Sequence, residues 1–174
     1  MRHRVTDLFL LAQADAGDRP ALAEEVELDA VAVEVTDLFR PRAQALHRQL
    51  AFGVVQPAVV RGDAMLLREA VFELLENACR HGDASAPVQI SVLTPTGNLR
   101  LEVANPGPPL PGLVGEAREE GGTGEPHGLG LEILRWIVQA HGGTVEVRRE
   151  QAVNVIALCF PAQPGSPITP HDLP

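Results

Sequence analysis

Residues 88–93 and 98–104 each alternate apolar side chains with other side chains, and the turn sequence TPTG separates them. An alternation with a period of two is typical of a β-strand that buries one face. Two such segments, joined by a short turn that contains Pro and Gly, predict an antiparallel hairpin. A second pair of predicted strands, 144–147 and 154–160, lies near the end of the chain. The fold must therefore contain antiparallel sheet.

Helical segments surround these strands. Apolar residues recur at helical spacing over 29–47, 63–81 and 128–141, and Asp29 and Asp63 are predicted to cap the first two helices. Further short strands are predicted at 26–28, 50–55 and 58–60. Because strands and helices do not alternate as in a βαβ fold, the sequence predicts an α+β sandwich. Its sheet would be mixed, largely antiparallel and covered by helices on one face.

The chain has 174 residues, a net charge of −9 and a pI of about 5.1. Such an acidic protein is not expected to bind nucleic acid, and an anionic ligand would need a local cradle of donors. No apolar run reaches the roughly 18 residues that span a membrane. Cys79 and Cys159 are not spaced as a metal site. We expect a reduced, cytoplasmic domain without membrane contact of its own, even if the full-length protein is anchored in the inner membrane.

Helix 63–81 carries a polar stripe beside its apolar one, made of Glu73, Asn77, Arg80 and His81. Glu73 and Asn77 lie one turn apart. A carboxylate beside an amide oxygen suits Mg²⁺, which prefers oxygen ligands and shares them with phosphates and water. Arg80 could meet phosphate charge. The alternative interpretation is an ordinary amphipathic helix with a solvated polar edge.

The predicted strand 98–104 breaks directly after Asn105 on the sequence PGPP. Strand alternation places Asn105 on the same face as Leu101 and Val103, so its side chain is expected to point inward. A buried amide needs a hydrogen-bond partner, and the edge of an adenine ring would supply one. The alternative is a structural turn in which the backbone satisfies the amide.

Gly128 and Gly130 open the last predicted helix. Glycines allow a phosphate to approach the backbone, and the start of a helix offers unpaired N–H groups and a positive dipole end. The alternative is a tight helix start without a ligand. Residues 111–127, rich in Gly and Glu, lie between this helix and the Asn105 turn and are predicted to form a mobile lid.

In this order the three segments resemble the ATP-binding catalytic domain of bacterial two-component sensor histidine kinases, which is grouped with gyrase, Hsp90 and anti-sigma-factor kinases. ELLENACRHG resembles the N box, VANPGPPLP the first glycine box and HGLGLEILRWIVQAHGG the second. LFLLAQADAGD is similar to the end of the dimerisation domain's second helix. The expected parts are a dimerisation-helix remnant (1–17), a linker (18–25), the ATP-binding catalytic domain (26–160) and a disordered tail (161–174).

The resemblance implies a Bergerat-type two-layer α/β sandwich that uses ATP and Mg²⁺. Asn77 would coordinate the Mg²⁺, and Glu73 would stand where the wider group places a water-activating or proton-accepting carboxylate. These two are the predicted catalytic residues, and Asn105 takes the position of the adenine-reading Asp. The predicted ATP contacts are Asn77, Arg80, His81, Asn105, Gly107, His127, Gly128, Leu129, Gly130 and Leu131.

The sequence departs from the family's pattern at several points. Asn105 replaces an Asp, Pro109 replaces a glycine and should stiffen its turn, and no Phe occurs between Pro111 and His127. The family's phosphoacceptor motif is not found. The expected reaction is therefore transfer of the ATP γ-phosphoryl group to a histidine on a separate dimerisation domain, with a response regulator downstream. A non-catalytic nucleotide-binding module and an anti-sigma-type serine kinase remain open alternatives.

Overall fold

The computed structural model describes residues 24–95, 97–109 and 129–161. Its elements are β1 (Glu24–Glu27), α2 (Leu28–Ala45), β2 (Leu50–Val55), β3 (Val59–Gly62), α3 (Ala64–His81), β4 (Val88–Leu93), β5 (Asn98–Pro106), α4 (Leu129–Ala140), β6 (Thr144–Glu150) and β7 (Val153–Pro161). The predicted dimerisation-helix remnant, most of the linker, the lid and nearly all of the predicted tail lie outside the described residues.

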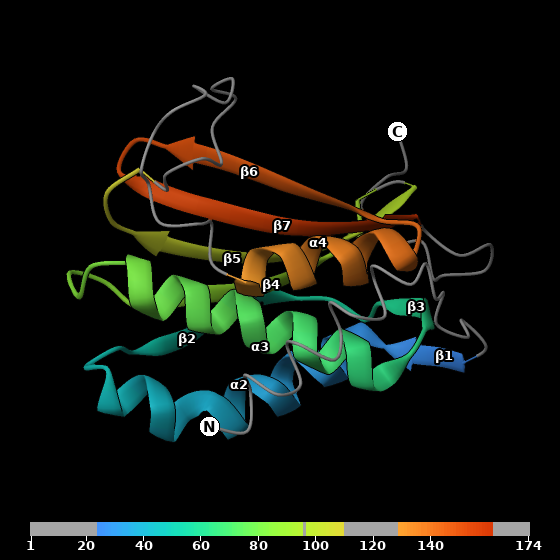
Figure 1. The fold of residues 1–174 in the computed structure, drawn as a ribbon, viewed down its shortest axis with the longest axis horizontal. Helices are drawn as coiled ribbons and strands as arrows, with labels where there is room; N and C mark the ends of the chain where they lie inside the picture. Colours follow the sequence, from blue (N-terminus) through green and yellow to red (C-terminus); the bar gives the residue numbers. More distant parts are fainter. Residues whose placement is uncertain (1–23, 96, 110–128, 162–174) are drawn as a thin grey trace.

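The main sheet has five strands in the order β2-β4-β5-β7-β6 (Figure 1). β2 runs parallel to β4, and the other neighbouring strands pair antiparallel. β1 and β3 form a separate antiparallel pair. The prediction of a mixed, largely antiparallel sheet is confirmed, as is the hairpin of β4 and β5.

Burial alternates along β5, and the inward residues Leu99, Leu101 and Val103 join one core with the apolar stripes of α2, α3 and α4. The helices therefore cover one face of the sheet. On the other face, β7 is an exception to the alternation, because its outward Val155 and Ala157 are also buried.

Two arginines cover that outer side of β7. Arg148 of β6 reaches across to Glu102 of β5 with bonds of 3.0 and 3.1 Å, and Arg100 of β5 reaches Glu146 of β6 at 2.6 Å. The apolar stems of such long side chains can shield small residues beneath them while the charged ends stay in water. The outward Val155 and Ala157 of this interior strand are thus shielded without a further layer of structure.

Of the two predicted helix caps, Asp63 and Asp29, only Asp63 is confirmed. Asp63 caps α3, accepting hydrogen bonds from the N–H groups of Met65 and Leu66 at 2.8 and 3.1 Å. The prediction that Asp29 caps the preceding helix is wrong, because α2 already begins at Leu28. Asp29 instead accepts a bond of 3.0 Å from the N–H of Ala58, so a tertiary donor competes with the local one.

Candidate nucleotide site

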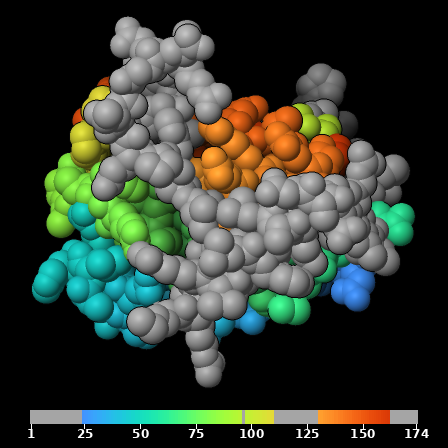
Figure 2. All heavy atoms as spheres, viewed as in Figure 1, coloured from blue at the N-terminus to red at the C-terminus, as the bar shows by residue number. Residues whose placement is uncertain are grey.

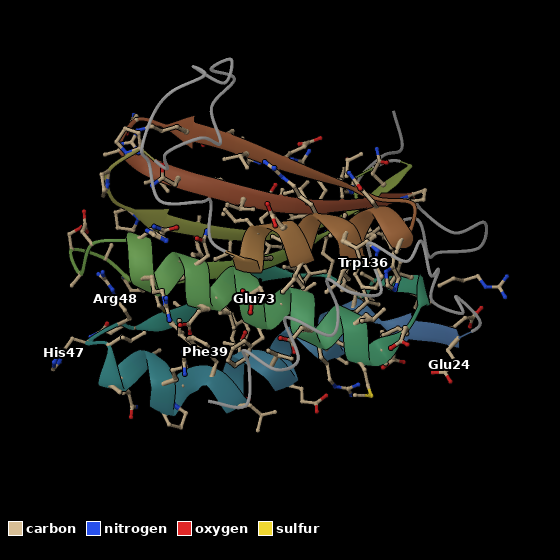
Figure 3. The ribbon with its side chains drawn as sticks, in the orientation of Figure 1. Glu24, Phe39, His47, Arg48, Glu73 and Trp136 are labelled. Atoms are coloured by element: carbon tan, nitrogen blue, oxygen red, sulfur yellow. The ribbon has the colours of Figure 1, made fainter. Side chains whose placement is uncertain are left out.

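The polar stripe of α3 faces α4 at the position of Glu73. Glu73 projects from α3 on the side of α4 (Figure 3). Its carboxylate lies so close to Gly130 that a Cβ atom at that position would overlap with Oε2. The apolar stripe of α3 fixes this orientation by packing into the core. Two residues that the sequence placed in separate segments are therefore in direct contact.

Asn77 lies one turn further along α3 and is half-buried. Its Nδ2 atom is buried and has no hydrogen-bond partner within the described parts of the chain. Buried polar atoms are usually paired, and an exception needs an explanation. A ligand that accepts a hydrogen bond at this position would supply one.

Arg80 and His81 lie at the end of α3 and are exposed. Arg80 is not free there, because its Nε donates to Glu76 at 2.7 Å. Glu76 also accepts two bonds from Arg42 of α2. Sequence reasoning missed this carboxylate, since nothing local indicates a partner on α2.

Charge pairing decides the ionisation of Glu76. Burial opposes its negative form, but the hydrogen bonds from Arg42 and Arg80 outweigh that effect and hold the pKa of Glu76 below its ordinary value. At the neighbouring Cys79, burial outweighs the attraction of Arg48 and Arg42 and raises the pKa of the thiol to about 11. Glu76 is therefore a carboxylate at neutral pH, whereas Cys79 is an unreactive core thiol.

Asn105, at the end of β5, is 1% exposed, as the strand alternation predicted. Its Nδ2 donates to the carbonyl of Pro106 at 3.3 Å, so the backbone satisfies one donor of the amide. A Cβ atom at Gly82 would lie 2.8 Å from the same Nδ2, and the N–H of Asp83 bonds to Pro106 at 2.8 Å. These contacts join the end of β5 to the end of α3.

The turn after Asn105 is held from the opposite side by β6 and β7. Asn154 donates to the carbonyl of Pro108 at 2.8 Å, and Arg149 donates to that of Gly107 at 3.0 Å. Arg149 also bonds to Asn154 at 2.7 Å. These two residues were missed, although Asn154 is a polar residue in the apolar run NVIALCF, which could have drawn attention to it.

At the start of α4, the structure describes Leu129, Gly130 and Leu131 but not His127 or Gly128, which lie outside the described residues. Leu131 is half-buried and packs against the core. α3 and α4 lie on one face of the molecule (Figure 2). Gly130, in the first turn of α4, adjoins the Glu73 side of α3.

In the described ranges, no three His, Cys, Asp or Glu side chains converge as a metal cage. A metal here would take few protein ligands. No described helix is long and apolar enough to cross a membrane.

This chain belongs to the family of histidine kinase-, DNA gyrase B- and HSP90-like ATPases, whose pattern matches residues 62–164. The matched segment contains the polar stripe of α3, the Asn105 turn and the start of α4. The resemblance inferred from the three motifs is thereby confirmed.

Similar proteins include the sensor histidine kinase CusS of Escherichia coli, 31% identical over 173 residues that cover 93% of this chain and 35% of CusS. Among solved structures, a mycobacterial sensor histidine kinase, MprB, is 26% identical with a TM-score of 0.65, covering 82% of this chain and 99% of that one. The Acinetobacter baumannii histidine kinase AdeS is similar in fold, with a TM-score of 0.75 at 21% identity over 94% of this chain and 79% of that one.

The chain spans about a third of the length of the curated relatives it matches. The domain is of the ATP-binding catalytic type that sensor histidine kinases carry, and these relatives favour neither a serine kinase nor a non-catalytic module.

Proposed function

We propose that this chain binds Mg²⁺–ATP between α3, the end of β5 and the start of α4. The γ-phosphoryl group would pass to a histidine on a separate dimerisation domain. The observation that carries the proposal is the meeting of three segments distant in sequence: Glu73 lies against Gly130, and Gly82, just beyond α3, lies against Asn105. The ATPase family that the chain matches supports the choice of nucleotide.

Asn105 is the residue we assign to the adenine ring. Its Nδ2 is engaged by Pro106, so Oδ1 would accept a hydrogen bond from the adenine amino group. Gly107 would let the turn lie close to the end of α3, since a Cβ there would lie 3.0 Å from the carbonyl oxygen of His81. The bonds from Arg149 and Asn154 would keep this turn in place.

The side chain of Asn77 fits a role beside Mg²⁺ and the phosphates. Mg²⁺ commonly takes one or two protein oxygens and completes its shell with phosphate oxygens and water, so it needs no cage of acidic residues. Oδ1 would ligate the ion, and Nδ2, which has no partner among the described residues, would donate to a phosphate oxygen. When bound, the ion would neutralise charge that develops on the phosphates.

Charge at the phosphates would be met from two sides. Arg80 and His81 stand at the end of α3, near the phosphates or the ribose, and the opposite side is the start of α4. The first N–H groups of a helix lack partners within the helix and bind anions. The residues proposed there are His127, Gly128, Leu129, Gly130 and Leu131.

Transfer would break the bond from the γ-phosphorus to ADP and form a bond to the unprotonated nitrogen of the imidazole. The proton on the other ring nitrogen would then be lost, and Glu73 would accept it directly or through water. We place the accepting histidine outside this chain. Among the described histidines, His141 is buried, with Nδ1 bonded to Ile137 and Nε2 to the N–H of Asp63. A response regulator would receive the phosphoryl group next.

The test is incubation with labelled ATP, Mg²⁺ and a separately produced dimerisation domain that carries a phosphoacceptor histidine. We expect acid-labile, base-stable label on the added domain, and none when Asn77 is replaced by Ala. Stable label on this chain alone would refute a separate acceptor. Measurable ATP binding without any transfer would refute the kinase function and leave a nucleotide-binding module.

A further inference from the structure

Glu76 is a buried carboxylate on the nucleotide helix that the proposed function does not use. It precedes Asn77 on α3, and its side chain is only 11% exposed. Buried carboxylates are retained in folds mainly when positive groups pair with them. The partners here are Arg42, from the last turn of α2, and Arg80, from the last turn of α3.

Arg42 fixes the carboxylate of Glu76. It donates through Nη2 to Oε1 at 2.6 Å and through Nε to Oε2, which is the two-bond geometry that orients a carboxylate most firmly. The guanidinium also lies over the ring of Phe72, 5.8 Å from its centroid. Phe72 packs edge-on against Phe39 at 5.1 Å. Arg42 is thus held in turn by the aromatic contacts between α2 and α3.

Arg80 depends on Glu76 in a different way. Its side chain is 63% exposed, and the contact with Glu76 uses Nε alone. A long, exposed arginine samples many rotamers unless something fixes it. A bond through Nε limits this freedom and does not require the two terminal nitrogens, which are the groups that bind phosphate oxygens.

We propose that Glu76 is a positioning residue that holds Arg80 toward the phosphates of the bound nucleotide. This inference rests on the proposed function, since it requires nucleotide phosphates beside the end of α3. Arg42 supports the arrangement from α2 by fixing the carboxylate, and Glu76 itself touches neither the nucleotide nor the metal. Ordering Arg80 before the nucleotide arrives reduces the entropy lost on binding, so the effect should appear in phosphate-dependent affinity.

The measurement is calorimetric titration of the chain with Mg²⁺–ATP and, separately, with adenosine, which lacks phosphates. Glu76→Gln should weaken ATP binding on the order of tenfold, the usual size for one charge-assisted hydrogen bond. Adenosine binding should not change. In an Arg80→Ala background, Glu76→Gln should have no further effect on ATP binding. Equal weakening for ATP and adenosine, or additive effects of the two substitutions, would overturn the proposal.

Two further variants separate positioning from structural support. Arg42→Gln removes the bonds between α2 and α3 that fix the carboxylate but keeps the contact of Glu76 with Arg80, so it should lower the ratio of ATP to adenosine affinity less than Glu76→Gln does. Arg80→Lys keeps the charge at an exposed site but cannot donate through Nε. If Glu76→Gln does not fold, the Arg80→Lys variant provides the test. If its ATP affinity equals that of the unchanged chain, Glu76 does not position Arg80.

Failure of this inference differs from failure of the proposed function. If the unchanged chain binds no Mg²⁺–ATP, both are wrong. If it binds Mg²⁺–ATP while Glu76→Gln leaves the ratio of ATP to adenosine affinity unchanged, only the role of Glu76 is wrong.

Discussion

The carboxylate of Glu73 on α3 lies against Gly130 on α4 and leaves no room for a Cβ atom there. Glycine in the first turns of a helix costs stability relative to alanine, because it lowers helix propensity. A neighbouring helix, rather than the local turn, therefore accounts for the glycine at this position. The contact also places the carboxylate beside the backbone proposed to bind phosphate.

Gly130→Ala should not stabilise the protein by itself, because the new methyl group must displace the Glu73 carboxylate. In a Glu73→Ala background the same substitution should raise the free energy of unfolding by about 1 kcal/mol, the usual helix-propensity gain. Urea denaturation of the unchanged chain, the two single variants and the double variant measures this coupling. Equal effects of Gly130→Ala in the two backgrounds would show that the contact carries no energy.

Asn105→Ala should reduce the preference for ATP over GTP, because it removes the amide oxygen proposed to accept from the adenine amino group. It also removes the bond to Pro106, so the free energy of unfolding should fall by about 1 kcal/mol. Competition titrations with the two nucleotides test selectivity separately from stability. An unchanged preference, despite the lost stability, would reduce Asn105 to a turn residue.

Stability should fall in acid partly through Glu76. Its folded-state pKa lies below the ordinary value of 4.5, so the native state binds fewer protons than the unfolded chain near that pH. The resulting stability is present above the ordinary value and is lost as the pH falls through the folded pKa. Denaturation at a series of pH values between about 6 and 3 should show a shallower loss for Glu76→Gln than for the unchanged chain. Arg42→Gln should reduce the slope as well, and parallel curves for all three proteins would contradict the assignment.

His47→Gly should stabilise the fold by about 0.5–1 kcal/mol, because a non-glycine residue pays a steric cost at positive φ. His47 follows α2 with a φ of 55° and is exposed, and the next N–H, of Arg48, bonds back to Ala43 at 2.8 Å. His47→Ala is the matched control, since it removes the imidazole but keeps the steric cost, and it should not stabilise. Thermal denaturation of the pair distinguishes backbone relief from loss of the imidazole. A gain of the same size in both variants would rule out the backbone explanation.

Local signals predicted much of this fold. The cap at Asp63 and the apolar period defined α3 almost to the residue, and the alternation around 94–97 defined the hairpin of β4 and β5. The sequence carries no comparable local signal for which distant strands pair with each other. β2 and β3 are consecutive, yet β2 joins the main sheet beside β4 while β3 pairs with β1. A strand pattern shows which face is buried but does not name the neighbouring strand.

The candidate site also has a part that the sequence predicted and a part that it did not. Helical periodicity put Glu73 and Asn77 on one stripe, and strand alternation turned Asn105 inward. The partners that hold these residues come from elsewhere in the chain. The pairing of Arg42 with Glu76 depends on how α2 packs on α3, and no period in the sequence of either helix encodes that packing.

The arginines that cross β7 have a consequence for how this sheet meets water. An apolar interior strand with one uncovered face would be a sticky surface, which proteins commonly bury under a further layer or use to bind a partner. Here the apolar stems of Arg100 and Arg148 shield Ala157 and Val155, and their guanidinium groups bond to Glu146 and Glu102. The two-layer sandwich therefore needs no third layer over β7, because arginines held in ion pairs shield the outer side of that strand.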